Sequence, residues 1–413
     1  MSQAAPRQLL YVLDRFPSYT LNFIYNEIAI LEESGYSIAL YSLLPAQTCP
    51  EEARPYLART RTVRPVPTER MLQAWLYYLL RRPWRLLGLL VALPLDNDRP
   101  QKALRTLGYL AVGVYFAWLI RDRHEHLHAH FTFKAALAAH VASRLNGNPY
   151  SFTSHGSHTV MPAKRLSLRR KTRGAAFIFA VSEYNRRLLL RLSPQYPAER
   201  IAVSRCGVRL EQFPFAPRGP RRPGPQRLLC VASFYAVKNH ETLLAACAQL
   251  AARGVDLELD LLGGDAERRR EGLERLAASL GLGPRVHFRG IVDHGGIVGY
   301  LRDADLMVLC SHSEGIPVSL MEAMAAGTPV LGPRVTGVPE LVEEGVSGWL
   351  ADPRRPEEFA DKMAAILADP AGTAPIAAAA RRTIEAHYDM SANSRARAAL
   401  FARFLDRAGA GSP

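Results

Sequence analysis

Short apolar runs alternate with helix-like stretches along almost the whole chain of 413 residues. Short apolar runs bounded by turn residues are typical of buried strands, and apolar residues spaced three or four apart are typical of helices. The pattern predicts strands at residues 8–13, 37–43, 126–130, 150–153, 177–181 and 201–204, and then at 227–232, 257–262, 286–289, 306–309 and 329–331. Helices are predicted between them, among them 21–34, 133–146 and 183–193. Such alternation predicts an α/β protein with parallel sheets.

A run rich in Pro, Arg and Gly at residues 213–226 interrupts the alternation. It predicts a linker between two domains. We expect a first Rossmann-like domain at 1–206, a linker at 207–226 and a second Rossmann-like domain at 227–388. A final helix at 389–413 follows, which can pack back on the N-terminal domain or on the second one. Two doubly wound domains of this kind face each other across a cleft, where the ligands of such sheets bind.

The charge balance points to an anionic partner. The chain carries 52 Lys and Arg against 38 Asp and Glu, a net charge of +14. Such a charge suits a nucleotide, a membrane surface or a nucleic acid. Nucleic acid is the weakest of these three, since the chain has neither a zinc-finger nor an RNA-binding aromatic motif, and we expect no nucleic-acid partner.

Cysteine usage and the N-terminus predict a cytoplasmic protein. The five cysteines are scattered and mostly sit in apolar patterns, with no CxxC pair, so we expect reduced core residues. The N-terminus leads straight into a strand without a signal peptide, which predicts that the protein is not secreted.

Two apolar segments near residue 100 bear on membrane association. Residues 104–120 are nearly uncharged but fall short of the ~20 residues of a membrane span, which predicts a buried helix. Residues 72–93 combine Trp75, Trp84 and three arginines. Two interpretations of this second stretch stay open: a helix pair on a membrane surface, and an ordinary amphipathic pair that covers the sheet.

Glu314 and Glu322 form the most informative pattern in the chain. Glu314 lies in a Gly/Pro loop, and Glu322 lies inside a small-residue helix that begins at Pro317 and ends at Gly327. Eight helical residues rise ~12 Å, too far for the ~5 to 9 Å of a glycosidase pair. The two acids instead suit the ends of an elongated ligand whose anion binds the helix amides between them. A sugar joined to a nucleoside through a diphosphate has that shape.

The segment from Asp303 to Pro353 resembles the donor-binding half of retaining glycosyltransferases of the family 4 type, which have the GT-B fold. The resemblance rests on the E-x7-E spacing of Glu314 and Glu322 and on the Gly-Val-Pro-Glu turn at 337–340. It implies that Glu322 binds the ribose and that Glu314 contacts the donor sugar. It also implies that Gly315 and the amides near Val318 and Ser319 hold the diphosphate.

A second donor loop follows the strand at 227–232. Relatives usually carry Gly-Arg there, followed five residues later by Lys. Lys238 matches and would neutralise the leaving diphosphate. Ser233 replaces the expected Arg, so the set lacks one cation unless Arg334 or Arg205 compensates.

In the first domain the resemblance points to His155. This histidine follows the strand at 150–153 in a Thr-Ser-His-Gly element, which resembles the family element whose histidine faces the donor sugar. A lone histidine is more often structural, and both interpretations stay open here. His128 and His130 resemble another element of the subgroup, for which we expect a structural or acceptor-side role.

The N-terminal Arg-Phe-Pro-Ser element at 15–18 resembles the colanic acid and exopolysaccharide branch of the family, although the usual acid after it is replaced at residues 20–22. The basic run at 164–173 is typical of a solvated helix face. Contact with a membrane-held diphosphate lipid is the alternative for this run.

The resemblance implies a retaining glycosyltransferase that moves a sugar, of the hexose type, from a nucleotide-diphosphate sugar to a glycan or polyprenyl-diphosphate-linked acceptor. Residues 1–206 would form the acceptor side and 227–388 the donor side. Catalysis is expected from His155, Lys238 and Glu314, without a metal or other cofactor. The protein is expected in the cytoplasm, with an anionic membrane at the inner face of the plasma membrane as a further partner. The alternative is a non-catalytic GT-B subunit, which the residues at Ser233 and 20–22 favour.

Overall fold

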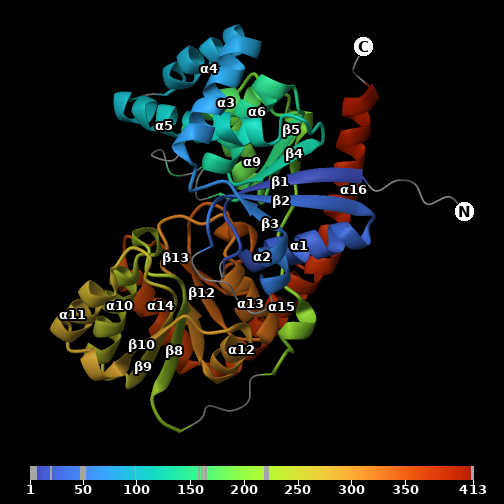
Figure 1. The fold of residues 1–413 in the computed structure, drawn as a ribbon. Helices are drawn as coiled ribbons and strands as arrows, with labels where there is room; N and C mark the ends of the chain where they lie inside the picture. Colours follow the sequence, from blue (N-terminus) through green and yellow to red (C-terminus); the bar gives the residue numbers. More distant parts are fainter. Residues whose placement is uncertain are drawn as a thin grey trace, which may run out of the picture. The chain divides into compact units, whose positions relative to one another are not determined.

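Two parallel β-sheets covered by helices make up the protein in the computed structural model (Figure 1). The structure describes residues 7–18, 21–46, 53–97, 99–156, 159, 161, 165–217 and 223–410. The chain divides into two compact units, one of Met1–Arg205 with Ser394–Pro413 and one of Cys206–Asn393.

The first unit contains a seven-stranded parallel sheet with the order β3-β2-β1-β4-β5-β6-β7. Its strands are β1 (Arg7–Arg15), β2 (Tyr36–Leu44), β3 (Thr60–Thr62), β4 (His126–His130), β5 (Tyr150–Ser154), β6 (Ile178–Ala180) and β7 (Ile201–Val203). The first six follow the 3-2-1-4-5-6 order of Rossmann sheets. All six predicted strands are confirmed. The prediction missed β3, because its three residues at the sheet edge, Thr-Arg-Thr, form no apolar run.

Successive residues of β1 face opposite sides of this sheet, and both sides are covered. Leu10 and Val12 belong to a core that α3 to α6 complete, whereas Leu9 and Tyr11 belong to a core with α1 and the last helix, α16. The helices of the unit are α1 (Asn22–Glu33), α2 (Arg54–Arg59), α3 (Thr68–Arg81), α4 (Pro83–Leu95), α5 (Pro100–Leu119), α6 (Lys134–Asn146), α8 (Leu168–Gly174), α9 (Glu183–Leu192) and α16 (Met390–Ala410). The chain therefore returns at its end to the sheet that it built first.

The second unit contains a six-stranded parallel sheet with the order β10-β9-β8-β11-β12-β13. Its strands are β8 (Gln226–Val231), β9 (Leu257–Leu262), β10 (Val286–Gly290), β11 (Leu306–Val308), β12 (Val330–Pro333) and β13 (Trp349–Ala351). Its α-helices are α10 (His240–Ala252), α11 (Arg270–Ser279), α12 (His294–Asp303), α13 (Val318–Ala326), α14 (Pro356–Ala368) and α15 (Pro370–His387). This order again reads 3-2-1-4-5-6, so the predicted class of two Rossmann-like doubly wound sheets is confirmed.

The predicted linker at 207–226 needs correction. Val208 pairs with Asp389 as an isolated β-bridge, and Phe213 is buried, with its carbonyl oxygen 2.8 Å from Nη1 of Arg381. Gln226 already belongs to β8. Val208 and Phe213 therefore pack within the second unit, and the Pro-rich composition around them does not reveal this from the sequence. Residues 218–222 of the predicted linker lie outside the described residues.

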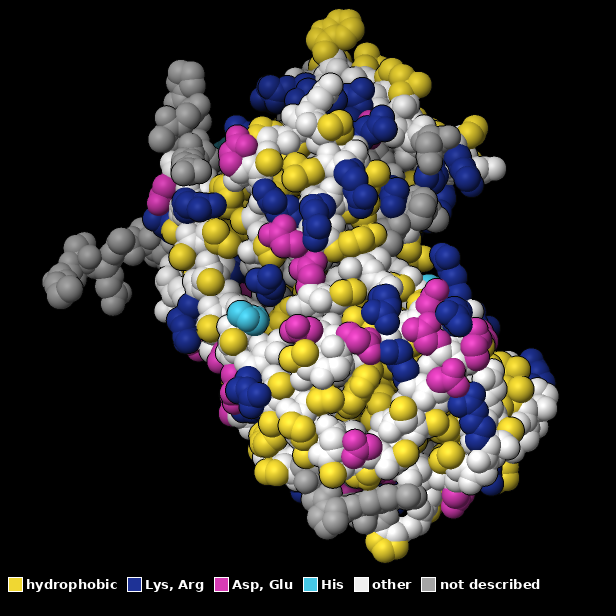
Figure 2. Space-filling model, turned by 180° about the vertical axis from the view of Figure 1, so that it is seen from behind, with side chains coloured by type: hydrophobic (Ala, Val, Ile, Leu, Met, Phe, Trp, Pro, Cys, Tyr) yellow, Lys and Arg dark blue, Asp and Glu magenta, His cyan; other side chains and the backbone are white. Residues whose placement is uncertain are grey.

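Helices α3, α4 and α5 form a layer that is apolar on both faces. Residues 113–117 of α5 are buried, as predicted for 104–120, whereas Leu104 and Leu107 of the same prediction are exposed. Gly113 permits close packing on α6, because an added Cβ would lie 3.0 Å from Cβ of Val141. The outer faces of all three helices expose large apolar side chains. Figure 2 shows hydrophobic side chains gathered at the end of the molecule where α4 lies in Figure 1, beside several Lys and Arg side chains.

No single helix within the described ranges has the length and apolarity needed to cross a bilayer. Helices α14 and α15 meet the length and composition conditions only when taken together, and the chain bends by 103° between them.

The basic run at 164–173 is only partly a solvated face. Lys171 on α8 is fully buried, and its Nζ donates to the carbonyl oxygens of Thr132 at 2.5 Å and Phe133 at 3.3 Å. Burial lowers the pKa of Lys171 to about 7. This lysine therefore supports the loop after β4 and does not serve the surface.

Four cysteines, Cys206, Cys230, Cys247 and Cys310, are free and buried, as predicted. Cys49 lies outside the described residues.

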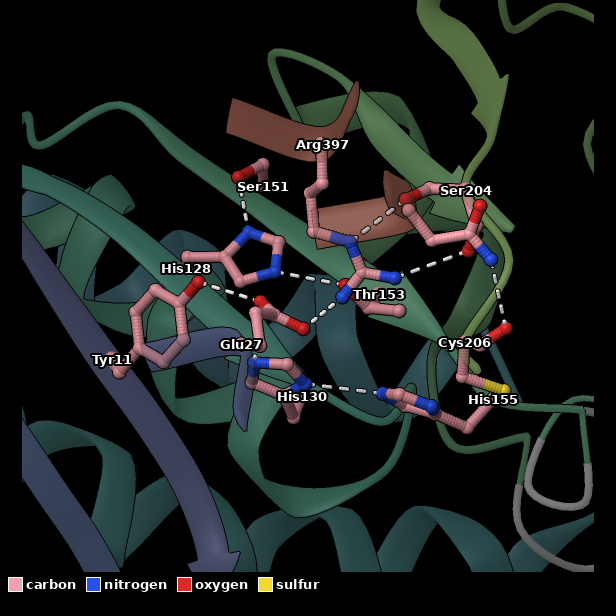
Figure 3. A network of polar contacts seen from close by, with 11 residues as sticks. Tyr11, Glu27, His128, His130, Ser151, Thr153, His155, Ser204, Cys206 and Arg397 are labelled. Atoms are coloured by element: carbon pink, nitrogen blue, oxygen red, sulfur yellow. Dashed lines mark hydrogen bonds and ion pairs between the residues drawn. The ribbon is translucent and has the colours of Figure 1, made fainter. Parts of the chain in front are cut away.

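A buried ion pair fastens α16 to the first unit (Figure 3). A guanidinium nitrogen of Arg397 on α16 contacts the Glu27 carboxylate on α1, and the two residues are 4% and 2% exposed. Nε of Arg397 also donates to Ser204 Oγ at 2.7 Å, and the Tyr11 hydroxyl donates to Glu27 Oε1 at 2.7 Å. Both charges are thus satisfied within the core.

Replacing Arg397 by Met is expected to destabilise the protein by about 3 to 5 kcal/mol, because the Glu27 charge then stays buried without its partner. The double variant Glu27→Gln/Arg397→Met is expected to lose less than the sum of the two single variants. Urea unfolding followed by circular dichroism measures both. Arg7→Met is the matched control, since Arg7 pairs with Asp406 of the same helix at 3.2 Å but in solvent, and about 0 to 1 kcal/mol is expected for it. Equal losses for Arg397→Met and Arg7→Met would contradict the prediction.

Candidate functional site

Lys238 lies at the carboxyl edge of the second sheet, on the loop that joins β8 to α10. A short 3₁₀ turn, η6 (Ala236–Lys238), carries it, and Asn239 follows with a positive φ of 53°. The Asn239 side-chain amide donates to the carbonyl oxygens of Cys310 at 3.1 Å and Pro353 at 2.9 Å. This buried amide therefore ties together the loops that follow β8, β11 and β13.

Glu314 lies on the loop after β11, next to Lys238. Lys238 Nζ and Glu314 Oε1 are 2.6 Å apart, with side chains that are 23% and 10% exposed. The Glu314 backbone is fixed by Thr336, whose hydroxyl accepts from the Glu314 amide at 3.0 Å and donates to its carbonyl oxygen at 2.5 Å. Strands β8 and β11 are neighbours, and the strand order reverses between them: β8 is followed by β9 and β10 towards one edge of the sheet, and β11 by β12 and β13 towards the other. The pair therefore occupies the topological switch point, where ligands of such sheets bind.

The same loop leads into the N-terminus of α13. Gly315 is buried in the loop, and Pro317 is the N-cap residue, with no side-chain hydrogen bond to the first turn. Val318 and Ser319 are half-buried. The first amides of a helix have no carbonyl partner within the helix and carry the positive end of its dipole. An anion placed here would meet these amides and the Lys238 ammonium group together.

Glu322 follows Val318 by about one turn of α13. It is 9% exposed, and no hydrogen bond or ion pair joins its carboxylate to another described residue. Burial raises the pKa of Glu322 from 4.5 to about 8. A buried carboxyl group without a partner is costly, which marks this position for a ligand that supplies hydrogen-bond donors.

Ser233 follows β8 and is half-buried. Gly263, after β9, passes so close to this loop that an added Cβ would lie 2.2 Å from Ala232 O and 2.7 Å from Ser233 Cα. Arg334, proposed from the sequence as a replacement for the missing cation, donates to Leu350 O at 2.8 Å and lies 3.4 Å from Glu344. That guanidinium is already bound at the sheet edge. Arg205, the other residue proposed, belongs to the first unit.

His155 lies in the first unit, directly after β5 (Figure 3). Its Nε2 is 3.1 Å from Nδ1 of His130, and its ring packs against Phe23 and Phe131 with centroids 4.9 and 4.5 Å away. The other ring nitrogen of His130, its Nε2, lies 3.5 Å from Glu27 Oε1. The ring of His155 is therefore held in place by a chain of polar groups that ends at the buried Glu27–Arg397 pair.

His128 makes a different set of contacts in the same core. Its ring nitrogens lie 2.8 Å from Ser151 Oγ and 2.9 Å from Thr153 Oγ1. Glu27, His128 and His130 are the three residues in the described ranges whose ligand atoms come within 4.8 Å of one another. A metal ion there would have to displace one of the two hydroxyl partners of His128 and compete with Arg397 for Glu27. Both ring nitrogens of His128 are hydrogen-bonded, whereas Nε2 of His130 is buried without a hydrogen-bond partner among the described residues and faces the Glu27 carboxylate.

The structure thus brings part of the predicted set together. Lys238 and Glu314 form a direct pair, and Gly315, Val318, Ser319 and Glu322 continue the same segment in the second unit. His155 belongs to the first unit. Sequence reasoning missed Asn239, Thr336 and Glu27, which position these residues. A signal existed for Glu27, because it shares one helical face with Ile24, Ile28 and Leu31, where an apolar residue would otherwise be expected.

Two doubly wound sheets of this order, with a cation, two acids and a helix N-terminus at the switch point of the second, define the GT-B class. Solved structures support this class. Sucrose-phosphate synthase from Thermosynechococcus elongatus matches with a TM-score of 0.73 at 20% identity over 97% of this chain and all of that one. HepE from Anabaena, solved with UDP-glucose, matches with a TM-score of 0.71 at 18% identity over 96% of this chain and 99% of that one. At these identities the likeness establishes the fold.

The family follows from sequence comparison. Residues 214–388 match the family model "Glycosyl transferases group 1". D-inositol 3-phosphate glycosyltransferase from Frankia alni is 30% identical over 279 residues, which are 62% of this chain and 68% of that protein. The chain belongs to the group 1 glycosyltransferase family.

Two further relatives narrow the branch. The putative colanic acid biosynthesis glycosyltransferase WcaL from Salmonella typhimurium is 40% identical over 181 residues, 42% of each chain. The amylovoran biosynthesis glycosyltransferase AmsK from Erwinia amylovora is 37% identical over 204 residues, 47% of this chain and 48% of that one. The match spans about half the length of these relatives. They confirm the predicted resemblance to the exopolysaccharide branch.

Replacing Glu322 by Gln is expected to change how stability depends on pH. The folded-state pKa of Glu322, about 8, lies above the 4.5 of an exposed glutamate, so between these values the folded state keeps a proton that the unfolded state has lost. The free energy of unfolding contributed by this group therefore falls as the pH rises from 4.5 to 8. The Tm of Glu322→Gln, relative to that of the unmodified protein, is expected to rise through this window. A Tm difference that stays constant from pH 5 to 8 would contradict the shift.

Proposed function

We propose that this protein transfers a sugar, of the hexose type, from a nucleotide-diphosphate sugar to a hydroxyl group of a glycan or lipid-linked acceptor. The observation that carries the proposal is the Lys238–Glu314 pair at 2.6 Å, placed at the switch point beside the N-terminus of α13. Cationic and amide groups at one point suit a diphosphate, and the buried Glu322 further along the helix suits a group rich in hydroxyls.

Lys238 and the α13 amides would bind the diphosphate and stabilise the charge that develops on it as the sugar leaves. Preorganised donors of this kind supply a large share of the catalytic effect in transfer reactions. The Lys238 ammonium group pairs with the Glu314 carboxylate. Arrival of a diphosphate offers it a second and stronger anionic partner, which would release one Glu314 oxygen to accept a hydrogen bond from a donor-sugar hydroxyl.

Glu322 would accept hydrogen bonds from the two ribose hydroxyls through its two carboxylate oxygens. Its burial without a protein partner supports this role, because the ligand would then provide the missing donors. We propose that His155 serves the same reaction from the first unit, with its ring orientation set by His130.

We further propose that the reaction retains the anomeric configuration and needs no metal. The acceptor hydroxyl would attack from the face that the diphosphate leaves, and its proton would pass to the departing phosphate oxygen. The positive charge that a metal ion would contribute is supplied in this scheme by Lys238 and by the positive end of α13.

The names of relatives support the substrates proposed. WcaL and AmsK are named for colanic acid and amylovoran biosynthesis, and HepE was solved with UDP and with UDP-glucose. These names support a nucleotide-sugar donor and a role in exopolysaccharide synthesis. We propose that the reaction takes place in the cytoplasm, because free cysteines such as those in the core are typical of proteins in a reducing compartment.

A second candidate function is binding of a nucleotide sugar without transfer. It is favoured by Ser233, which stands where the family usually has Arg, and by Arg334, whose guanidinium is bound elsewhere. The loss of one cation weakens stabilisation of the leaving group more than it weakens ground-state binding.

Lys238→Met is expected to lower kcat for sugar transfer about 10²- to 10³-fold, because it removes a preorganised cation from the leaving group. A thermal-shift panel with UDP, GDP, ADP and their sugars first identifies the donor, since a ligand that binds the folded state raises the Tm. Transfer is then assayed with that donor in the presence of EDTA. Lys362→Met is the matched control, because Lys362 forms a similar 2.5 Å pair with Glu344 in the same unit. Equal activity of the two variants, or loss of all activity in EDTA, would count against the mechanism.

Ser233→Arg is expected to raise affinity for the nucleoside diphosphate about 10-fold and to increase turnover, since a charge-assisted hydrogen bond contributes about 1.5 to 3 kcal/mol. Isothermal titration and the transfer assay measure the two effects. If both proteins bind the nucleotide sugar and neither one transfers it, the second candidate function holds instead.

A further inference from the structure

The outer faces of α3, α4 and α5 expose an unusual amount of apolar surface. Of fourteen exposed large apolar residues in the described part of the chain, ten lie on these three helices. They are Leu72, Leu76, Leu79, Leu80, Trp84, Leu87, Val91, Leu95, Leu104 and Leu107, here called the apolar face. Contiguous exposed apolar surface marks a site of interaction with another molecule or a membrane.

Helical spacing shows that this surface is built into the sequence. On α3 the exposed leucines at 72, 76, 79 and 80 fall on one side, and Ala74 and Tyr78 are buried on the other. On α4 the exposed residues at 84, 87, 91 and 95 follow the same spacing, opposite the buried Leu86, Leu89 and Leu93. A helix of a water-exposed layer would carry polar residues on its outer side. Here the second apolar side is as regular as the first.

Arginines accompany the apolar face. Residues 68–110 expose six of them, namely Arg70, Arg81, Arg82, Arg85, Arg99 and Arg105. Glu69 is the one exposed acid among the described residues of that span. No ion pair between described residues engages these six guanidinium groups. Arg81 and Arg105 lie over the rings of Tyr77 and Phe133, and Nη1 of Arg85 donates to the carbonyl oxygen of Leu145 at 3.4 Å, which leaves its charge without a counter-ion. Their charge therefore remains available to an external anion.

We propose that the apolar face docks on an anionic lipid bilayer, with α3 and α4 lying in the interface and the arginines on the lipid headgroups. Trp84, 83% exposed on the first turn of α4, suits the headgroup level, where indole rings concentrate. Leucines entering the acyl boundary and arginines meeting anionic headgroups strengthen binding together. This proposal stands on the first unit alone and does not depend on the transfer reaction.

A second copy of the chain fits the surface less well. A two-fold interface would bring this basic face against the same basic face of the second copy, and like charges disfavour that arrangement. An anionic bilayer instead supplies negative charge and apolar volume at once. Figure 2 shows the two kinds of side chain interspersed at this end of the molecule, which is the arrangement that an interface of lipid headgroups and acyl chains requires.

Vesicle flotation with the full-length protein tests the proposal. Vesicles of phosphatidylcholine with about one third phosphatidylglycerol are compared with pure phosphatidylcholine. The protein is expected to float with the anionic vesicles, at least about 10-fold more strongly than with neutral ones, and to be released by high salt. Failure to float with anionic vesicles, or equal binding to both, would overturn the proposal.

Two sets of substitutions localise the contact. Leu76→Gln/Leu80→Gln/Trp84→Gln and Arg81→Gln/Arg82→Gln/Arg85→Gln are each expected to reduce partitioning onto anionic vesicles about 10-fold or more. Leu57→Gln/Val346→Gln is the control, since it removes exposed apolar residues outside α3 to α5, and it is expected to bind as the unmodified protein does. All positions are exposed, so folding should be preserved, which Tm measurements verify. Binding that is unchanged in the first two sets, or sedimentation showing a dimer that the leucine set abolishes, would refute lipid docking.

Discussion

In both sheets the strand order reverses beside the first strand, and the carboxyl ends of the two strands at this switch point are where such sheets bind ligands. The switch point lies between β1 and β4 in the first unit and between β8 and β11 in the second. Side chains that directly follow these two neighbouring strands therefore lie close to one another. Lys238 follows β8 and Glu314 follows β11, and they meet as a pair although 76 residues separate them.

In each unit, buried polar groups fix the position of the candidate residues. Asn239 joins three loops through two carbonyl oxygens, and Thr336 fixes the Glu314 backbone from both sides. In the first unit, the Glu27–Arg397 pair plays a related part, because Glu27 lies beside His130 and His130 contacts His155. The final helix therefore contributes to the position of a residue encoded far earlier in the chain. Glu322 differs from all of these, since it is buried and no hydrogen bond or ion pair joins its carboxylate to another residue in the described ranges.

Much of the fold was predictable from the sequence, because parallel strands buried on both faces consist of continuous apolar runs. All eleven predicted strands are present. The two that were missed, β3 and β13, are edge strands of three residues each: β3 (Thr-Arg-Thr) has no apolar run, and the apolar run of β13 (Trp-Leu-Ala) is too short to indicate a strand. The predicted linker is too long for a similar reason. Val208 and Phe213 contact Asp389 and Arg381, which are distant in the sequence.

The sequence by itself determined the two doubly wound sheets, the family and the type of residue at each candidate position, because these depend on local periodicity and on spacing along one segment. Only the tertiary structure decided which of these residues meet and in what state. Lys238 pairs with Glu314, Glu322 is buried without a hydrogen bond or ion pair to another described residue, Lys171 is buried, and of the two apolar sides of α3 and α4 one is buried and the other exposed. The physical reason is that burial and pairing depend on residues that are distant in the chain. The pattern of residues along the sequence does not specify which of these distant residues come into contact.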